Sequence, residues 1–163
     1  MIEIQAAGAV AAPAASVFDH LADLRTHWQL TDGRVRLLDG GDGDPARGGR
    51  VRMRGPLGVG REARTEVIVA ERPRLLEGRA TIGPRTEARI RWRLKPCGEA
   101  ATLVELSAAV TSIGAFDRAL LALGGRIWLE RLFSRAIGRL AALAPEISAS
   151  PAAGLAAVSG AGR

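Results

Sequence analysis

The sequence predicts an α+β domain in which a curved antiparallel sheet wraps around one long C-terminal helix. Three observations support this fold class. Near the C-terminus, apolar residues recur every three or four positions, as on one face of a helix. Between residues 35 and 111 they alternate with polar residues, as in strands with one buried face. Glycine, proline and aspartate separate the alternating segments, and such short turns join antiparallel neighbours.

The N-terminal elements are short. Residues 2–11 alternate loosely and predict a first strand. Pro13 is a typical residue for the first turn of a helix. A helix is expected over residues 14–24, because four apolar residues there have helical spacing: Val17, Phe18, Leu21 and Leu24. A second short helix is expected over residues 25–30.

The alternating region predicts five or six further strands, which makes six to seven in the whole sheet. The alternation is clearest in residues 88–95, where Ala88, Ile90, Trp92 and Leu94 are separated by charged residues. One face of the sheet is therefore expected to be apolar and the other to carry arginine and glutamate. The predicted strands lie at 35–38, 51–53, 65–69, 75–82, 88–95 and 102–111.

The long helix is predicted over Ala115–Leu143. Its apolar face changes direction at Gly124 and Gly125, and because glycine weakens a helix, a kink is expected there. After the helix the chain is rich in Ala, Gly, Ser and Pro, without periodicity. The expected organisation is one ligand-binding domain at 1–144 and a flexible tail at 145–163.

Composition narrows the classes of partner. The net charge is +6, but acidic residues are interleaved with the arginines and there is no tyrosine for stacking on bases, so no nucleic-acid partner is expected. No apolar run is long enough to span a membrane, and the N-terminus does not resemble a signal peptide. With Cys97 as the single cysteine, the expectation is a cytoplasmic protein.

The basic residues of the strands have two interpretations. Cross-strand ion pairs with glutamate account for them without a function, whereas a docking surface for an acidic protein partner is the functional alternative. The residues concerned are Arg50, Arg52, Arg54, Arg89, Arg91 and Arg93.

Few residues carry the signature of catalysis. Asp23 and His27 are four residues apart and could form a carboxylate–imidazole pair, either as a surface ion pair or to orient a general base at the mouth of a cavity. The two histidines, His20 and His27, lack a usual metal-ligand spacing, and Cys97 has no nearby base. The sequence therefore predicts no metal and no cofactor.

A cavity is expected where the long helix and the curved sheet diverge. A large aromatic residue in a sheet is often simply part of the core, so Trp92 could serve either role. Tryptophan and methionine side chains with few ionisable groups suit a flat or chain-like apolar ligand. The predicted ligand-binding residues are Trp28, Met53, Val67, Trp92, Leu106, Phe116, Leu120 and Trp128.

Two short segments carry a resemblance to a known superfamily. Residues Pro13–Asp23 resemble the entry motif of the SRPBCC superfamily, which contains START domains, polyketide cyclase/dehydrase-like proteins and birch-pollen allergens. Glu71–Leu75 resembles that group's acidic-Pro-Arg-Leu turn, and the end of the last helix, Ile137–Leu143, also fits. The resemblance covers residues 2–143. Residues Leu123–Arg126 are also similar to the Gly-containing C-terminal helix of the carbon-monoxide-dehydrogenase accessory protein type.

The resemblance implies the helix-grip fold, with a hydrophobic cavity between the sheet and the C-terminal helix. It does not imply one activity, because members bind lipids, quinones, plant hormones or polyketides, only some transform them, and no catalytic motif is common to all. Few polar residues fall on the apolar strand phase, which favours binding or carriage of a small hydrophobic ligand. The alternatives are a polyketide cyclase or dehydratase, and an accessory protein that docks a partner through its Arg-rich sheet face. The sequence leaves the ligand and the choice between monomer and dimer open.

Overall fold

A computed structural model describes residues 2–40, 48–55 and 58–150 of the chain. In this part of the protein seven strands form one antiparallel sheet, in the order β1-β7-β6-β5-β4-β3-β2. The strands are β1 (Ile2–Val10), β2 (Val35–Gly40), β3 (Gly48–Arg54), β4 (Gly60–Glu71), β5 (Leu75–Ile82), β6 (Thr86–Pro96) and β7 (Thr102–Ser112).

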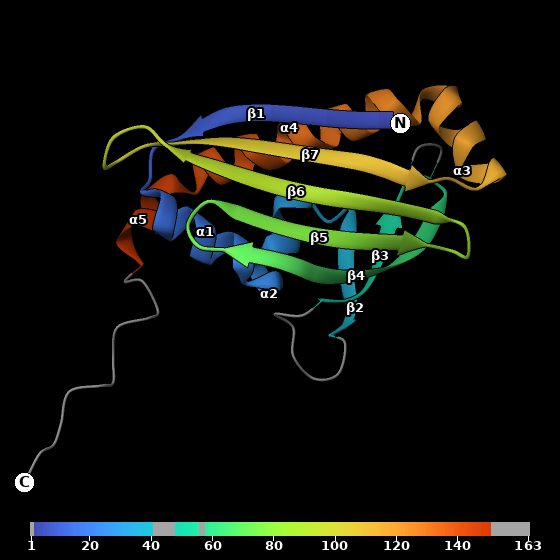
Figure 1. Ribbon diagram of the computed structural model, residues 1–163, viewed down its shortest axis with the longest axis horizontal. Helices are drawn as coiled ribbons and strands as arrows, with labels where there is room; N and C mark the ends of the chain where they lie inside the picture. The colour runs from blue at the N-terminus through green and yellow to red at the C-terminus, as the bar shows by residue number, and fades with distance from the viewer. Residues whose placement is uncertain (1, 41–47, 56–57, 151–163) are drawn as a thin grey trace, which may run out of the picture.

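Short helices follow β1, and the longest helix follows β7. The helical elements are α1 (Ala14–Ala22), α2 (Leu24–His27), the 3₁₀ turn η1 (Trp28–Thr31), α3 (Ala115–Leu120), the π-helical segment η5 (Leu121–Gly125), α4 (Arg126–Ala142) and α5 (Ala144–Ala149). Figure 1 shows α4 behind the sheet, with α1, α2 and α5 on the same side. This is the predicted α+β helix-grip architecture.

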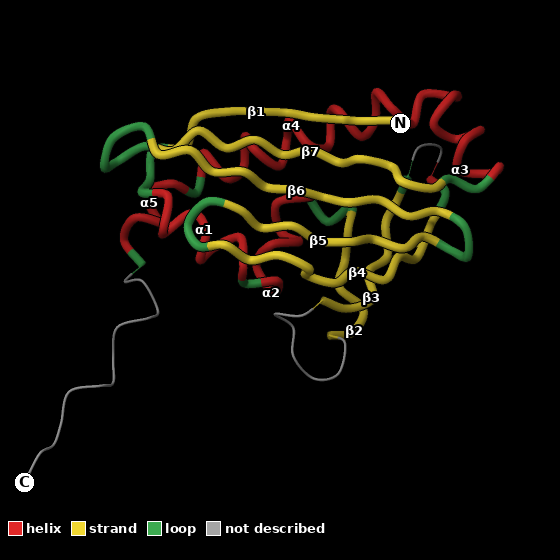
Figure 2. Tube along the Cα trace, viewed as in Figure 1, coloured by secondary structure: helices red, strands yellow, loops and turns green. Residues whose placement is uncertain are grey.

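The sheet is strongly curved. In Figures 1 and 2 its β2–β3 edge turns away from the direction of β5 and β6. The register shifts in three places, where one strand has an extra residue: Leu38 in β2, Ile68 in β4 and Thr111 in β7. An extra residue in one strand bends it and increases its twist. These irregularities therefore help the sheet to bend around the helical side.

The core lies between the concave face of the sheet and α4. The helix buries the side chains that share its predicted apolar face: Leu132, Phe133, Ala136, Ile137 and Leu140. It approaches β1 closely at Gly8, where an added Cβ atom would lie 2.6 Å from Cγ2 of Ile137. A glycine at this position thus lets the helix pack directly on the sheet.

The two segments that carry the superfamily resemblance contact each other. Arg72, in the turn between β4 and β5, donates from Nε and Nη2 to the two carboxylate oxygens of Asp19 in α1, at 2.7 and 2.9 Å. The pair links the turn to the first helix. Both side chains are substantially exposed, so its contribution to stability is small.

Two features of the C-terminal region refine the expectations. The predicted kink is confirmed: Leu123 and Gly124 have non-helical backbone angles, and η5 separates α3 from α4. The beginning of the expected tail is instead helical, because α5 buries Ala144 and Ile147. The rest of the expected tail, residues 151–163, lies outside the described residues. No helix in the described ranges has the length and apolar character needed to cross a bilayer.

Candidate functional site

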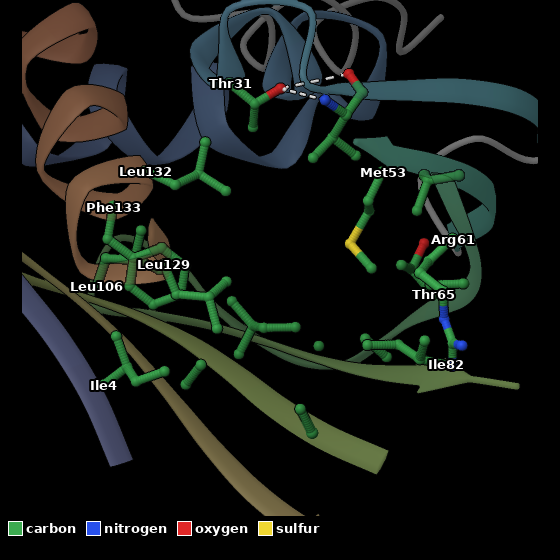
Figure 3. Close-up of a pocket in the computed structure, with 18 of the residues that line it drawn as sticks. Ile4, Thr31, Met53, Arg61, Thr65, Ile82, Leu106, Leu129, Leu132 and Phe133 are labelled. Atoms are coloured by element: carbon green, nitrogen blue, oxygen red, sulfur yellow. Dashed lines mark hydrogen bonds between the residues drawn. The ribbon is translucent and has the colours of Figure 1, made fainter. Parts of the chain in front are cut away.

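A cavity of about 290 Å³ lies between the concave face of the sheet and the helical side. Figure 3 shows Met53, Thr65 and Ile82 on one side of this space and Leu129, Leu132 and Phe133 on the other. Its walls come from β1 to β7, from the α2–η1 segment, and from the continuous segment of α3, η5 and α4.

The strand alternation accounts for the apolar lining on the sheet side. The apolar side chains that line the cavity occupy every second position on these strands, so most of the charged residues between them face outward. On three neighbouring strands they are Leu76, Gly78, Ala80 and Ile82 from β5, Ala88, Ile90 and Trp92 from β6, and Leu106, Ala108 and Val110 from β7.

Small residues in neighbouring positions explain why the space is open. Gly78 pairs with Ile90, which pairs with Ala108 on the next strand. In the adjacent row Ala80 pairs with Ala88. Because side chains on paired strands stand directly beside one another, this group of glycine and alanine leaves room that larger residues would fill.

Seven of the eight predicted ligand-binding residues are in the cavity wall: Trp28, Met53, Val67, Trp92, Leu106, Leu120 and Trp128. Trp92 is also 4% exposed and belongs to the hydrophobic core, so its interpretation as a core residue is confirmed. Contact of these residues with a ligand stays a prediction.

The structure places Phe116 elsewhere. Its side chain is 54% exposed, and the guanidinium carbon of Arg61 lies 5.0 Å from the centre of its ring. Leu120 lines the cavity, whereas Phe116, one helical turn earlier in α3, does not. Phe116 is therefore not a wall residue in this structure.

The hydroxyl groups of two wall residues are already engaged by the backbone. Thr31 donates through Oγ1 to the carbonyl of Trp28 at 2.6 Å and accepts from the amide of Val35 at 3.2 Å. Its interaction with Val35 is drawn in Figure 3. Thr65 donates to the carbonyl of Gly49 at 3.1 Å. Neither threonine therefore makes the wall strongly polar.

One polar cluster in the cavity wall joins β4, β6 and α3. The guanidinium of Arg61 donates to the carboxylate of Asp117 at 3.0 Å, and Thr86 donates its hydroxyl to the same carboxylate. The hydroxyl of Thr86 in turn accepts from the amide of Gly114 at 3.0 Å. The cluster ties α3 to the sheet, and sequence reasoning missed it because its residues are far apart in the chain.

His27 is the second polar feature of the wall. Its Nδ1 lies 3.0 Å from the carbonyl of Leu21, which can only accept, so Nδ1 carries the proton and neutral imidazole leaves Nε2 as an acceptor. Its ring lies edge-on to Trp28 and Trp92, with centroid distances of 5.0 and 5.5 Å. Burial lowers the pKa of His27, against the Leu21 hydrogen bond, which raises it.

The predicted pairing of Asp23 with His27 does not orient this ring, since the hydrogen bond goes to Leu21. The charge of Asp23 acts on His20 instead: burial lowers the pKa of His20, and Asp23 partly offsets that effect.

On the outer face of the sheet, ion pairs account for several of the arginines. Nε of Arg91 lies 2.7 Å from the buried carboxylate of Glu77, and Arg89 lies 3.7 Å from it. Arg50 pairs with Asp39 and Arg52 with Glu62. These contacts support the structural interpretation of the basic strands.

A strongly curved antiparallel sheet that encloses an apolar cavity against a C-terminal helix places the protein in the helix-grip class. The chain belongs to the polyketide cyclase/dehydrase and lipid transport family, whose model matches residues 1–145. The match confirms the resemblance to the SRPBCC superfamily. The similarity to the carbon-monoxide-dehydrogenase accessory protein type stays a prediction.

Solved structures with the same fold cover nearly the whole chain. A protein of Thermus thermophilus is 19% identical with a TM-score of 0.70, over 91% of this chain and 100% of its own. A START superfamily protein of Mycobacterium smegmatis is 18% identical with a TM-score of 0.62, over 86% and 98% of the two chains. The Zhui aromatase/cyclase of Streptomyces sp. R1128 is 21% identical with a TM-score of 0.56, over 90% and 93%.

At these identities the likeness shows the fold alone. A search of the curated proteins found no match.

Proposed function

We propose that the protein binds and carries a small hydrophobic ligand, such as a lipid, a quinone or a polyketide-like molecule, in the cavity between the sheet and α4. The apolar lining is the observation that carries this proposal. The small residues Gly78, Ala80, Ala88 and Ala108 leave space for the cavity, and Met53, Trp92 and Trp128 line it. Its volume of about 290 Å³ is close to the lower end of the range of roughly 300–1,000 Å³ that small-molecule sites occupy.

Native mass spectrometry of the protein as purified tests the proposal. The expected result is a mass above that of the chain which organic extraction removes, or uptake of an added apolar probe that changes tryptophan fluorescence. Trp28, Trp92 and Trp128 all lie in the wall, so a ligand changes their surroundings directly. A protein that carries nothing and shows no tryptophan response to any apolar probe contradicts the proposal.

A second candidate, a cyclase or dehydratase, is favoured by one observation. Neutral His27 lies in the cavity wall, and a general base must be unprotonated and within reach of the substrate. His27→Ala separates the two functions. It abolishes turnover of a bound polyketide-like substrate if the protein is such an enzyme, while binding persists; unchanged binding and turnover exclude the role of His27.

Docking of a protein partner through the Arg-rich sheet face stays a weaker alternative, because ion pairs account for many of the residues concerned.

We further propose a cytoplasmic location. It is supported by the single cysteine, Cys97, which is free and exposed, as is typical of reducing compartments.

A further inference from the structure

The segment from α3 to the start of α4 has two different sides. Towards the cavity it contributes Leu120, Leu121, Gly125 and Trp128. Towards solvent it presents three large apolar side chains, Phe116, Leu123 and Ile127, which are 54%, 73% and 55% exposed. In the described ranges, Leu38 at 43% is the other large apolar side chain with comparable exposure. The same short segment thus separates an apolar cavity from solvent and is itself apolar outside.

Core packing does not account for this exposure. Helix α3 has no buried residue. It is held to the sheet by the hydrogen bonds that Arg61 and Thr86 donate to Asp117. At the break, Leu123 and Gly124 leave the helical conformation, and Leu123 is the most exposed of the three side chains. Figure 1 shows α3 at the end of the molecule, beyond the sheet. Large apolar side chains left exposed on one short segment indicate a surface that binds a partner.

The surrounding charge is positive. Arg118 is exposed on α3, and the Cβ atom of Arg85 lies 3.4 Å from the position of a Cβ added to Gly114, just before α3. Neither arginine has an ion-pair partner among the described residues. The nearby acids are engaged, Asp117 by Arg61 and Glu130 by Arg126. Apolar side chains flanked by uncompensated arginines fit the surface of a bilayer that contains anionic lipids.

We propose that this α3 face, formed by Phe116, Leu123 and Ile127 with Arg85 and Arg118, docks the protein on an anionic lipid bilayer. The inference rests on the proposed function, because a hydrophobic ligand partitions into membranes and the α3 face covers the wall of the cavity that would receive it. A second copy of the chain fits less well. Three side chains offer only a fraction of the roughly 800 Å² that each partner buries in a stable interface, and self-association would bring arginines together.

Sedimentation with lipid vesicles tests the proposal. The protein is mixed with vesicles of phosphatidylcholine alone or of an equal mixture with phosphatidylglycerol. We expect binding to the mixed vesicles, and an affinity about tenfold lower for Leu123→Ser or Ile127→Ser, because each removes a side chain that the bilayer would bury. Arg118→Ser is expected to weaken binding to the mixed vesicles and to leave any binding to phosphatidylcholine vesicles unchanged. Added salt should likewise weaken binding to the mixed vesicles only, because it screens charge.

Leu38→Ser is the matched control, since Leu38 is an exposed leucine on β2, outside the α3 face. It is expected to bind vesicles as the wild type does. Absence of wild-type binding, equal binding by Leu123→Ser, or an equal loss in Leu38→Ser overturns the proposal. Light scattering that shows a dimer which Leu123→Ser dissociates, without vesicle binding, assigns the face to a second copy instead.

Ligand content is measured on the same preparations. A protein that carries a hydrophobic ligand but binds no vesicles contradicts the docking proposal and leaves the proposed function intact. A protein that binds vesicles through the α3 face but never takes up an apolar molecule supports docking and contradicts the proposed function.

Discussion

At the scale of single residues, His27 couples the cavity to pH. Burial holds the pKa of the folded imidazole below 6.5, so at mildly acidic pH the unfolded chain binds this proton more readily. The contribution of His27 to stability is therefore complete above the unfolded value and lost as pH falls below it. We expect the free energy of unfolding to fall between about pH 7 and pH 5, and His27→Gln to flatten this dependence.

Urea denaturation at a series of pH values measures the effect. His20 provides the comparison, since burial lowers its pKa too and His20→Gln should also remove part of the slope. The carboxyl group of Asp39 does not contribute to the slope between pH 7 and pH 5. Its hydrogen bonds to Arg50 lower its pKa from the ordinary value of 3.8, so it titrates below this range. If His27→Gln and the wild type give parallel curves, the neutral buried imidazole is not what determines the dependence.

The residues in the wall were only partly predictable. Alternation placed Met53, Trp92 and Leu106 on the inner face, because the face of a strand follows directly from the two-residue period. The sequence could not show how far along α3 the cavity extends, so Phe116 was predicted in the wall together with Leu120. The Arg61–Asp117 pair spans 56 residues of sequence and carries no local signal.

At the scale of elements, the break between α3 and α4 gives a direct comparison of two glycines. Gly124 has φ of +104°, whereas Gly138 lies within α4, where an added Cβ meets nothing within 4 Å. We expect Gly124→Ala to lower the free energy of unfolding by about 1–3 kcal/mol, because L-residues are strained at such angles. Gly138→Ala should raise it by about 0.5–1 kcal/mol, because alanine favours the helix.

Both variants add one methyl group to the same C-terminal helical region, so urea denaturation of the two isolates the backbone effect. Similar stabilities for Gly124→Ala and Gly138→Ala would mean that α3 and α4 can join without the positive φ. In that event Leu123 should also become less exposed to a quencher or a surface label.

The elements themselves were largely predictable, and the misses have physical causes. The strands and the kink at Gly124 follow from periodicity and glycine content, which are local properties. Helix α5 was missed because six residues are too few to show a helical period, and it forms where Ile147 becomes buried. In β4, the consecutive apolar residues Val67, Ile68 and Val69 reflect the register shift, which a simple alternation does not indicate.

At the scale of the whole molecule, the cavity depends on register. The sequence shows which residues share a face of one strand, but not which residues of two strands lie side by side. The row that joins Gly78, Ile90 and Ala108, and the pairing of Ala80 with Ala88, become visible only in the assembled sheet. A cavity could thus be expected from the fold class, whereas its position and size could not.

This dependence on register leads to the last prediction. Ala88 on β6 lines the cavity, while Ala109 on the neighbouring strand β7 lies between the lining positions Ala108 and Val110 and so faces the other way. Ala88→Leu adds a branched side chain to open space, so we expect the affinity for an apolar probe to fall about tenfold or more. Stability should change by less than about 1.5 kcal/mol, because no packed neighbour has to move.

Ala109→Leu makes the same chemical change on the outer face and should leave probe affinity unchanged. Titration of both variants with one fluorescent apolar probe, together with urea denaturation, provides the comparison. Equal loss of affinity would show that the probe binds outside the cavity or that the sheet as a whole responds to added bulk. Loss confined to Ala88→Leu would identify the open space beside Ala80 and Ala88 as the volume that a ligand occupies, because Ala109→Leu adds the same side chain to a neighbouring strand but on the outer face.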